Sequence, residues 1–540
     1  MKSGGKRRDG YTQRLFRNTS GQEEMYDKSL EEELEERSAH PITCLLLPFD
    51  SDGARRKHFN EKLKEYLADP GFRKIDGFPN ASDDDIIALS DPPYYTACPN
   101  PFTKSFIETY SKPYDPSLDY NREPFTADVS EGKSHPIYNA HSYHTKGPHQ
   151  AIMRYILHYT APGDVIFDGF CGTGMAGVAA QMCGDKSAVQ SLGYKVDNAG
   201  TIYRRETDET GAEAWTRFSQ LGARPAILSD LSPAATFIAY NHNFPVDIPR
   251  LEHETGRILR EVDERCGWMY QTKDDPASEP SRVNYIVWSD VFLCPDCSSD
   301  VVFFNVAVDS STGEIKDSFK CQGCGSELTK PSLMRKYATR LGLDSAQPIQ
   351  VAVQIPVLIN YSTGGTRQTK DPSRWDFDLL ARIDNTPTRY YYPKDRIDRD
   401  IDIWYERDYK SLGLNSLDSF YTKRNLLYLS ELFHEINNGQ SDVRRALKFC
   451  FTGTVQIASR MSSFRYDSRN PNNTAGGILK GALYIPSLSK EAQGLGVLYI
   501  TSAWNRKHRT FGKPSRPTSS AWRRTRFIWP LGWQSGRFGR

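Results

Sequence analysis

A carboxylate and a group of glycines follow a short apolar run in the stretch GDVIFDGFCGTGMAG, which spans Gly163–Gly177. The run Val165–Phe167 predicts a buried strand that ends at Asp168. The glycines allow the backbone to turn tightly and to approach a ligand closely before a small-residue helix, Met175–Met182. We therefore expect a nucleoside-bearing cofactor at the carboxyl end of this strand.

The spacing of these glycines is compatible with two kinds of cofactor. Gly172, Gly174 and Gly177 satisfy the GxGxxG pattern of dinucleotide sites, with Asp197 at a suitable distance for a ribose, but this pattern alone is a weak signal. The residues DGFCGTG resemble instead the D-x-F-x-G-x-G signature of S-adenosylmethionine-dependent DNA amino-methyltransferases, which usually carry Pro in place of Gly169. The resemblance runs from position 144 to position 180 and includes the helix that leads into the strand.

The resemblance implies a set of cofactor-binding residues. They are His144, Lys146, Asp168, Phe170, Gly172, Gly174 and Asp230. His144 and Lys146 would border the methionine end of S-adenosylmethionine, and Phe170 would lie near its adenine. Asp230 ends a second predicted strand, where an acid in this kind of sheet meets the ribose hydroxyls. The alternative is that Asp230 only caps the helix predicted to start at Ser232-Pro233.

A second motif, Asp91-Pro92-Pro93-Tyr94, follows the apolar segment Ile86–Leu89, which predicts a short strand. An exocyclic amine is a poor nucleophile because its lone pair is delocalised into the ring. Asp91 and the carbonyl of Pro92 can accept its two hydrogens, and Tyr94 offers a face on which a flipped base can stack. The resemblance implies that these four residues are catalytic; the alternative is a Pro-rich turn after a strand.

The order of the two motifs resembles the permuted arrangement of the family, in which the catalytic loop is encoded first. Fewer than fifty residues separate Tyr95 from Tyr143, and they show no strand alternation. The remaining strands of a methyltransferase sheet therefore do not fit between the motifs. Either they follow the cofactor lobe, or the tetrapeptide is an accessory copy and the catalytic loop lies elsewhere.

Two CxxC pairs predict a metal site. Cys294 and Cys297 form the first pair and Cys321 and Cys324 the second, and a segment that we expect to form a β-hairpin, including VVFFNVAV, joins them. This layout is typical of a zinc ribbon, in which four thiolates close a tetrahedral site. We expect a structural zinc ion that stabilises folding. The alternative is four unrelated reduced cysteines.

The composition excludes few function classes. The 540 residues can build two to four domains, and a net charge of +2 gives the whole chain no nucleic-acid signature. No apolar run reaches the roughly 18 residues that a membrane span requires, so we expect a cytoplasmic protein without membrane contact. Ten cysteines are few for this length, and in a reducing compartment the four in CxxC pairs point to metal rather than to disulfides.

The predicted fold class is α/β: a Rossmann-like methyltransferase sheet, complete or incomplete, with an inserted zinc ribbon and a mixed α/β C-terminal region. The expected order is a mobile polar arm (1–39), a lead-in segment with the DPPY loop (40–142), the S-adenosylmethionine-binding lobe (143–290), the ribbon (291–328), a mixed region (329–490) and a basic Trp/Arg-rich tail (491–540).

The last two segments are the candidates for nucleic-acid contact. In the mixed region, Tyr421–Arg424 before an amphipathic helix can meet phosphates, although such clusters are more often solvated helix starts. The tail has no Asp or Glu after Glu491 and can bind nucleic acid through Arg and Trp. An alternative that we weigh equally is that the tail is disordered, or that its sequence results from a shifted reading frame or a truncation and does not belong to the folded domain.

The sequence thus predicts an S-adenosylmethionine-dependent DNA methyltransferase acting on adenine N6 or cytosine N4 of double-stranded DNA. The resemblance also admits nuclease or helicase subunits as partners, as in bacterial restriction-modification or phage-defence systems. Two alternatives remain at this point: methylation of RNA or a protein amide, and a truncated or inactive DNA-binding module that retains the cofactor lobe and the ribbon.

Overall fold

The computed structural model describes most of the chain between residues 41 and 492. The described ranges are 41–113, 115–117, 120–128, 132–143, 146–207, 211–309, 312–341, 348–397, 409–439, 443–465, 477–478, 483–492 and the backbone of 527–530. The chain divides into two compact units, unit 1 (Met1–Arg250 with Ala503–Arg540) and unit 2 (Leu251–Ser502). Each unit is described by itself.

Unit 1 begins with a β-hairpin and four helices. The hairpin pairs β1 (Ile42–Cys44) with β2 (Leu47–Phe49), and the helices are α2 (Asp52–Leu67), α3 (Pro70–Arg73), α4 (Asp83–Leu89) and α5 (Thr103–Tyr110). Helix α2 has an apolar stripe, since Phe59, Leu63 and Leu67 are buried in one cluster. This cluster also contains Ile227 of the sheet described below, so the lead-in helices pack directly on the rest of the unit.

The strand predicted at Ile86–Leu89 is wrong, because these residues form the last turns of α4. Ser82 caps this helix by accepting a hydrogen bond from the backbone N–H of Asp85, and the acids at positions 83–85 occupy its first turn. A side-chain cap and negative charge at a helix N-terminus stabilise the helix over a strand. The tetrapeptide therefore follows a helix.

Three parallel strands form the sheet of unit 1, in the order β19 (Phe527–Pro530), β7 (Ala226–Asp230), β3 (Ile166–Asp168). The strands predicted to end at Asp168 and Asp230 are confirmed, so both acids lie at one edge of this sheet. The prediction that the first of these strands is buried is wrong, because Ile166 is half-buried and Phe167 is 69% exposed. The strand β19 comes from the predicted tail; residues 493–526 and 531–540 of that tail lie outside the described part of the chain.

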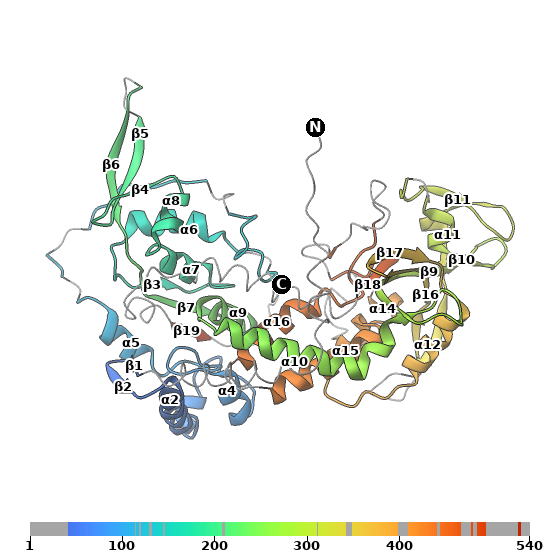
Figure 1. Cartoon of the computed structure of the whole chain (residues 1–540), viewed down its shortest axis with the longest axis horizontal. Coiled ribbons are helices and arrows are strands. Elements are labelled where there is room, and N and C mark those ends of the chain that lie inside the picture. The colour runs from blue at the N-terminus through green and yellow to red at the C-terminus, as the bar shows by residue number, and fades with distance from the viewer. Residues whose placement is uncertain are drawn as a thin grey trace, which may run out of the picture. The chain divides into compact units, whose positions relative to one another are not determined.

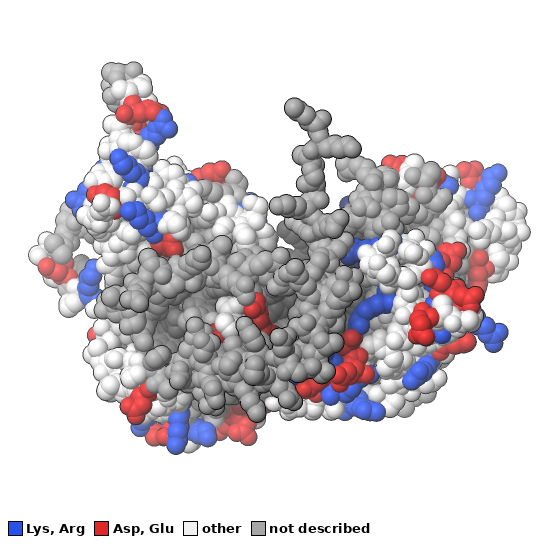
Figure 2. All heavy atoms as spheres, viewed as in Figure 1, with Lys and Arg blue, Asp and Glu red and all other residues white. Residues whose placement is uncertain are grey.

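Helices α6 (His149–Tyr159), α7 (Met175–Met182) and α9 (Pro233–Asn243) share one buried core with β7. The predicted helices at Met175 and after Ser232 are confirmed, and Ser232 is the N-cap of α9. Between α7 and β7 the chain adds α8 (Lys186–Ser191) and an antiparallel sheet of β4 (Lys195–Val196), β5 (Thr201–Thr207) and β6 (Glu213–Gln220). The β5–β6 hairpin projects from unit 1 (Figure 1), and acidic and basic side chains both lie along it (Figure 2).

Unit 2 is built around one long strand, β9 (Ser281–Leu293). The strands of its sheet are β8 (Gln271–Thr272), β10 (Asp300–Val302), β13 (Met334–Arg335), β16 (Gln354–Thr363), β17 (Thr366–Lys370) and β18 (Leu488–Ala492). All neighbouring pairs in this sheet are antiparallel.

Smaller elements complete unit 2. Two further hairpins pair β11 (Ser318–Lys320) with β12 (Glu327–Thr329) and β14 (Tyr337–Leu341) with β15 (Pro348–Ala352). The helices are α10 (Ile248–Cys266), which begins at the boundary, α11 (Phe303–Ala307), α12 (Arg374–Asp384), α14 (Tyr409–Leu412), α15 (Lys423–Asn438) and α16 (Arg444–Val455), with 3-10 turns η1 (Gly267–Tyr270), η2 (Lys330–Ser332) and η3 (Leu417–Phe420). The prediction of a strand over VVFFNVAV is wrong beyond Val302, because α11 follows.

Within the described residues, every helix is too short or too polar to cross a bilayer. This finding agrees with the absence of long apolar runs in the sequence.

Candidate active site

The glycine loop, residues 169–174, leaves β3 with a backbone that only glycine adopts easily. Gly172 and Gly174 have φ of +50° and +74°, in the left-handed region. A Cβ atom on Gly174 would lie 2.7 Å from the Cβ of Ala239, so a side chain there would clash with α9 as well. The loop is therefore held close to α9 and offers backbone rather than side chains to a ligand.

Two carboxylates lie next to this loop. The backbone N–H of Gly172 donates to Oδ2 of Asp230 (2.9 Å), and the N–H of Ser232 donates to Oδ1 (2.9 Å). Asp168 accepts from the N–H of Phe170 (3.1 Å). Burial raises the pKa of Asp168, and the charge of Asp230 raises it further. Asp230 is not the N-cap of α9, because Ser232 occupies that position. Its bond from Gly172 instead connects the glycine loop to the end of β7.

Aromatic rings flank the loop. The ring of Tyr143 lies against Gly172, where a Cβ atom would be 3.4 Å from its Cε1. The side chain of Tyr143 also bonds Ser232, and burial together with Asp230 raises its pKa. Phe170 is 85% exposed, so its ring is open to a ligand. The sequence did not single out Tyr143, although it lies one residue before the stretch that carries the resemblance.

The structure describes some of the predicted site residues that precede the glycine loop. Lys146 donates from Nζ to the carbonyl oxygens of Tyr138 and His141 (2.6 Å for His141), so its ammonium group ties this segment together. His144 lies outside the described residues. His149 begins α6, is fully buried, and neither ring nitrogen has a hydrogen-bond partner within the described structure. Burial, together with the neighbouring His135, lowers the pKa of His149 to about 3.

In the tetrapeptide loop, Asp91, Pro92 and Pro93 are buried and Tyr94 is half-buried. Nη2 of Arg55 donates to Oδ1 of Asp91 (2.9 Å), and Nη1 of Arg55 donates to the carbonyl oxygen of Pro92 (2.6 Å). The hydroxyl of Tyr240 donates to Oδ2 of Asp91 (2.5 Å). Burial alone would lower the pKa of Arg55, but Asp91 and Asp52 raise it well above its usual value. The Asp91 carboxylate therefore faces a permanently charged guanidinium.

The sequence reasoning missed Arg55 and Tyr240. Arg55 lies one helical turn before Phe59, so it continues the buried stripe of α2, and an Arg on an apolar stripe requires an anionic partner. Tyr240 occupies the buried face of α9 in the same way. Its ring stacks on Tyr95, with the ring centroids 4.9 Å apart. The positions of Arg55 and Tyr240 on buried helix faces predict that each has a polar partner, but they do not predict which residue that partner is.

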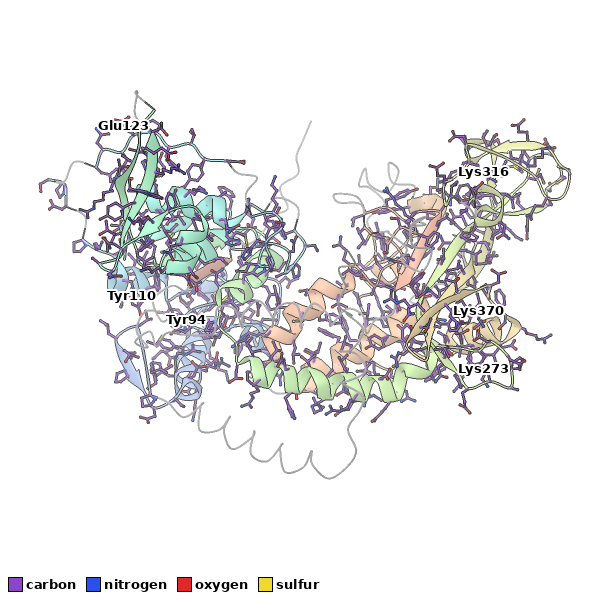
Figure 3. The ribbon with its side chains drawn as sticks, turned by 45° about the horizontal axis from the view of Figure 1, so that its top comes forward. Tyr94, Tyr110, Glu123, Lys273, Lys316 and Lys370 are labelled. Carbon is purple, nitrogen blue, oxygen red and sulfur yellow. The ribbon has the colours of Figure 1, made fainter. Side chains whose placement is uncertain are left out.

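Tyr94 lies between the two cores of unit 1 (Figure 3), and it packs against both clusters of buried residues. The guanidinium carbon of Arg55 lies 4.8 Å from the centroid of its ring. The other face of the loop is fixed by Asn100, whose Nδ2 donates to the carbonyl oxygen of Pro93 (3.0 Å). One face of Tyr94 is therefore occupied by a planar cation.

Helix α9 joins the tetrapeptide loop and the glycine loop. Its Tyr240 bonds Asp91, while Asn243 donates from Nδ2 to the carbonyl oxygen of Gly174 (3.0 Å). The ring of His242 bonds the carbonyl oxygen of Thr173 (2.9 Å). These three residues lie within four positions of one another on one helix. Two motifs separated by more than seventy residues in the sequence thus meet at the same helix in the same unit.

The four cysteines of the CxxC pairs meet in unit 2. Their Sγ atoms all lie within 4.8 Å of one another, at 3.8 Å between Cys294 and Cys324 and 3.7 Å between Cys297 and Cys321. Four thiolates about 2.3 Å from a tetrahedral zinc ion are about 3.8 Å apart. The two knuckles have the same backbone: the residue after each pair, Ser298 or Gly325, has positive φ and donates its N–H to the carbonyl of the first cysteine. The donor set and its geometry fit a closed, structural metal site.

A cavity of about 1270 Å³ lies in unit 2, between the β14–β15 hairpin, β16, α12 and the start of α15. Five cationic side chains line it (Arg340, Arg396, Lys423, Arg424 and Arg460), against three acidic ones (Asp384, Asp418 and Glu491). Arg424 is buried and bonded to Glu491 at 3.0 Å, so it is not available to phosphates as the sequence suggested. Arg340 and Arg396 have no ionic partner within the described ranges.

The groups at the glycine loop fit S-adenosylmethionine. Gly172 and Gly174 present bare backbone, Asp230 ends the second strand beside them, and Phe170 offers an exposed ring. The two neighbouring carboxylates have no cation against them within the described residues, and S-adenosylmethionine carries a sulfonium and an ammonium group. The donor set therefore suits a cationic nucleoside.

The glycine loop at the end of a parallel strand and the Asp-Pro-Pro-Tyr turn meet at one helix, as the resemblance to amino-methyltransferases implies. The sequence model of the N6/N4 DNA methylase family matches residues 90–199, which include both loops. This part of the chain is a DNA methylase domain of that family, as the motifs predicted. No curated protein and no solved structure matches the chain.

Proposed function

We propose that unit 1 is an S-adenosylmethionine-dependent DNA methyltransferase that modifies the exocyclic amine of adenine (N6) or cytosine (N4). The observation that carries the proposal is the position of α9, which holds Asp91 through Tyr240 and the glycine loop through His242 and Asn243. A methyl donor and a methyl acceptor must be adjacent for direct transfer. The meeting of the two loops at one helix supports this requirement.

In the proposed mechanism the target base is flipped from the duplex and stacks on Tyr94. Oδ1 of Asp91 and the carbonyl oxygen of Pro92 accept the two hydrogens of the amine, which makes its nitrogen more tetrahedral and more nucleophilic. Pro93 stiffens the loop so that both acceptors stay aligned. When bound, S-adenosylmethionine would supply the methyl group as an electrophile and leave as S-adenosylhomocysteine, while the amine would lose one of its two hydrogens as a proton; no covalent intermediate with the protein is needed.

The residues of the glycine loop position the donor. Asp230 is proposed to accept the ribose hydroxyls, with Asp168 beside it, and Phe170 is proposed to offer its ring to the adenine. Lys146 supports this part of the site indirectly, through its bonds to the carbonyls of Tyr138 and His141. The proposed place of His144 at the methionine end stays a prediction.

The test is incubation of the full chain with labelled S-adenosylmethionine and genomic DNA that lacks modification, followed by nucleoside analysis. We expect label in N6-methyladenine or N4-methylcytosine. Label in tRNA or in protein would instead favour an RNA or protein amide substrate. Cofactor binding without transfer to any of these substrates would contradict the proposal and favour an inactive DNA-binding module.

We propose that the cysteine cluster holds one structural zinc ion. Metal analysis of the purified chain is expected to give one zinc per molecule, and the ion should be lost in Cys321→Ser. The matched control is Cys450→Ala, which changes a buried cysteine of unit 2 outside the cluster. Because structural zinc contributes to folding, chelation should lower the thermal stability of unit 2 and leave cofactor binding by unit 1 intact.

We further propose that the cationic cavity of unit 2 takes part in target recognition by binding DNA phosphates. Burial lowers the pKa of Arg460 to about 10, with Asp290 opposing this shift and the nearby charge of Arg340 adding to it, so a bound anion would favour the charged guanidinium. The double change Arg340→Gln with Arg396→Gln should weaken DNA binding and reduce its salt dependence by about one ion per lost phosphate contact. Arg374→Gln, on the exposed side of α12, is the matched control.

A further inference from the structure

Arg55 bonds the same two acceptors that the proposed mechanism assigns to the target amine. Its Nη2 is 2.9 Å from Oδ1 of Asp91, and its Nη1 is 2.6 Å from the carbonyl oxygen of Pro92. Its guanidinium carbon lies 4.8 Å from the ring centroid of Tyr94, over the face proposed for the base. A guanidinium group is planar and presents N–H donors at its edge, as the amino edge of adenine or cytosine does.

As long as Arg55 bonds Asp91 and Pro92, a base cannot bind to these two acceptors. The side chains of both Arg55 and Asp91 are 0% exposed, so nothing reaches the two acceptors from solvent. A base that donates to Asp91 and Pro92 must displace two charge-assisted hydrogen bonds, which are among the stronger ones in proteins. Access to the acceptors therefore depends on Arg55.

We propose that Arg55 is an internal mimic of the target base, which closes the base site until DNA displaces it. This inference rests on the proposed function, because it takes Asp91 and Pro92 as the acceptors of the amine. It assigns a regulatory role to α2, which lies outside the residues matched by the family model.

The surroundings of Arg55 allow it to leave without stranding Asp91. Tyr240 keeps its bond to Oδ2, and Nε of Arg56 lies 3.4 Å from Oδ1, so the carboxylate retains a donor and a nearby cation. Nε of Arg55 is held by Asp52 (2.8 Å), whose side chain is 43% exposed. A displaced guanidinium can stay paired with Asp52 at the surface, or it can meet a DNA phosphate.

The alternative is a purely structural ion pair, in which Arg55 only neutralises a buried carboxylate. The two roles predict opposite effects of restoring the guanidinium. In Arg55→Ala, added methylguanidinium should refill the vacated position and recover stability under either role. Under the mimic it competes with the base and inhibits transfer, whereas under the structural role it restores transfer.

The experiment compares wild type, Arg55→Ala and Arg56→Ala, the last removing a neighbouring cation that does not bond Pro92. Thermal stability is measured with deoxyadenosine or deoxycytidine as the probe. We expect one of the nucleosides to stabilise Arg55→Ala and neither to stabilise wild type or Arg56→Ala. Apparent nucleoside affinity should rise at least about tenfold in Arg55→Ala, because the open fraction of the site limits binding in wild type.

Transfer assays complete the test. In Arg55→Ala, methylguanidinium should act as an inhibitor competitive with DNA. The proposal is overturned if no nucleoside stabilises Arg55→Ala, or if methylguanidinium restores transfer along with stability. Arg55→Lys, which keeps the charge but can bond only one acceptor at a time, serves if the alanine variant does not fold, and it should bind the nucleoside more tightly than wild type does. Nucleoside binding without methyl transfer by any form would support the mimic and contradict the proposed function, so the two failures are distinguishable.

Discussion

The two motif loops of unit 1 differ sharply in how open they are. The glycine loop carries an 85% exposed Phe170 and two carboxylates bonded only to backbone N–H groups within the described structure. The tetrapeptide loop carries Asp91, which is 1% exposed and is bonded by both Arg55 and Tyr240. The first loop is ready to receive a ligand, and the second is closed by the chain's own side chain.

This difference separates two tasks that the proposed active site must perform. A cofactor site can be preformed, because S-adenosylmethionine is small and its pocket needs only a glycine backbone and a few acceptors. An amine-acceptor site left open would expose a buried carboxylate and carbonyl without partners, which costs free energy. Arg55 satisfies both acceptors when no base is present.

The largest effect is expected from Asp91→Ala. It should reduce methyl transfer at least about 100-fold, because it removes an acceptor of the reacting amine, and leave cofactor affinity unchanged. It should also lower the free energy of unfolding by about 3–5 kcal/mol, because the buried charge of Arg55 loses its partner. Transfer assays, cofactor titration and urea denaturation measure the three quantities.

The double variant Arg55→Ala with Asp91→Ala controls for the stability loss. Removing both charges should recover part of the free energy of unfolding, since neither ion is left unpaired, but should not recover transfer. Full transfer activity in either variant would show that the tetrapeptide is an accessory copy, and the comparison between the two loops would lose its functional meaning.

The next largest effect is expected from Gly174→Ala in the open loop. The change combines the strain of a positive φ with a clash against Ala239, so it should destabilise unit 1 by about 2–4 kcal/mol and weaken cofactor binding. Gly193→Ala is the matched control: Gly193 has φ of +87° but nothing within 4 Å of the added Cβ. It should cost only about 1–2 kcal/mol and leave cofactor affinity intact.

Equal losses in the two glycine variants would indicate that strain alone matters and that the loop does not depend on close packing against α9. Denaturation curves and cofactor titrations of both variants decide this point.

The open loop could be predicted from the sequence because its signals are local. A run of apolar residues, an acid and closely spaced glycines define a strand, its end and a turn within ten positions, and the structure confirms strands that end at Asp168 and Asp230. The CxxC pairs are local in the same way, and each predicts its own knuckle.

The closed loop could not be predicted because its contacts are long-range. Arg55 is 36 positions from Asp91, and Tyr240 is 149 positions away. Periodicity shows that both lie on buried helix faces, but it contains no information on which polar groups meet across the fold. The helix α4 was missed for a different reason: its Ser82 cap and the following acids are a local signal, and the apolar residues after them were given more weight.

A third prediction concerns how the free energy of unfolding depends on pH, and thus the pH range in which the variants of the two loops can be compared. His149 has a folded-state pKa of about 3, against about 6.5 in an unfolded chain. The unfolded chain therefore binds more protons between these values, so this contribution to stability is complete above pH 6.5 and declines as the pH falls. From pH 7.5 to 5.5 the loss should be about 1.4 kcal/mol.

Urea denaturation at the two pH values measures this loss. His149→Gln, which does not titrate, should show a pH dependence smaller by the same amount, while the remaining titratable groups act equally in both proteins. An identical pH dependence of the two proteins would mean that His149 is solvated rather than buried at the start of α6.

The smallest effect, and the sharpest test of the open loop, is expected from Phe170→Ala. Because the side chain is 85% exposed, its removal should leave the free energy of unfolding unchanged within about 0.5 kcal/mol. Loss of a ring that contacts the cofactor should weaken cofactor binding by about 0.5–1.5 kcal/mol. Phe167→Ala, which removes a 69% exposed ring from the adjoining strand β3, is the matched control and should not change cofactor affinity. If both variants bind the cofactor as wild type does, the exposed ring of Phe170 has no part in the site, and the openness of the glycine loop must serve a ligand that approaches only its backbone.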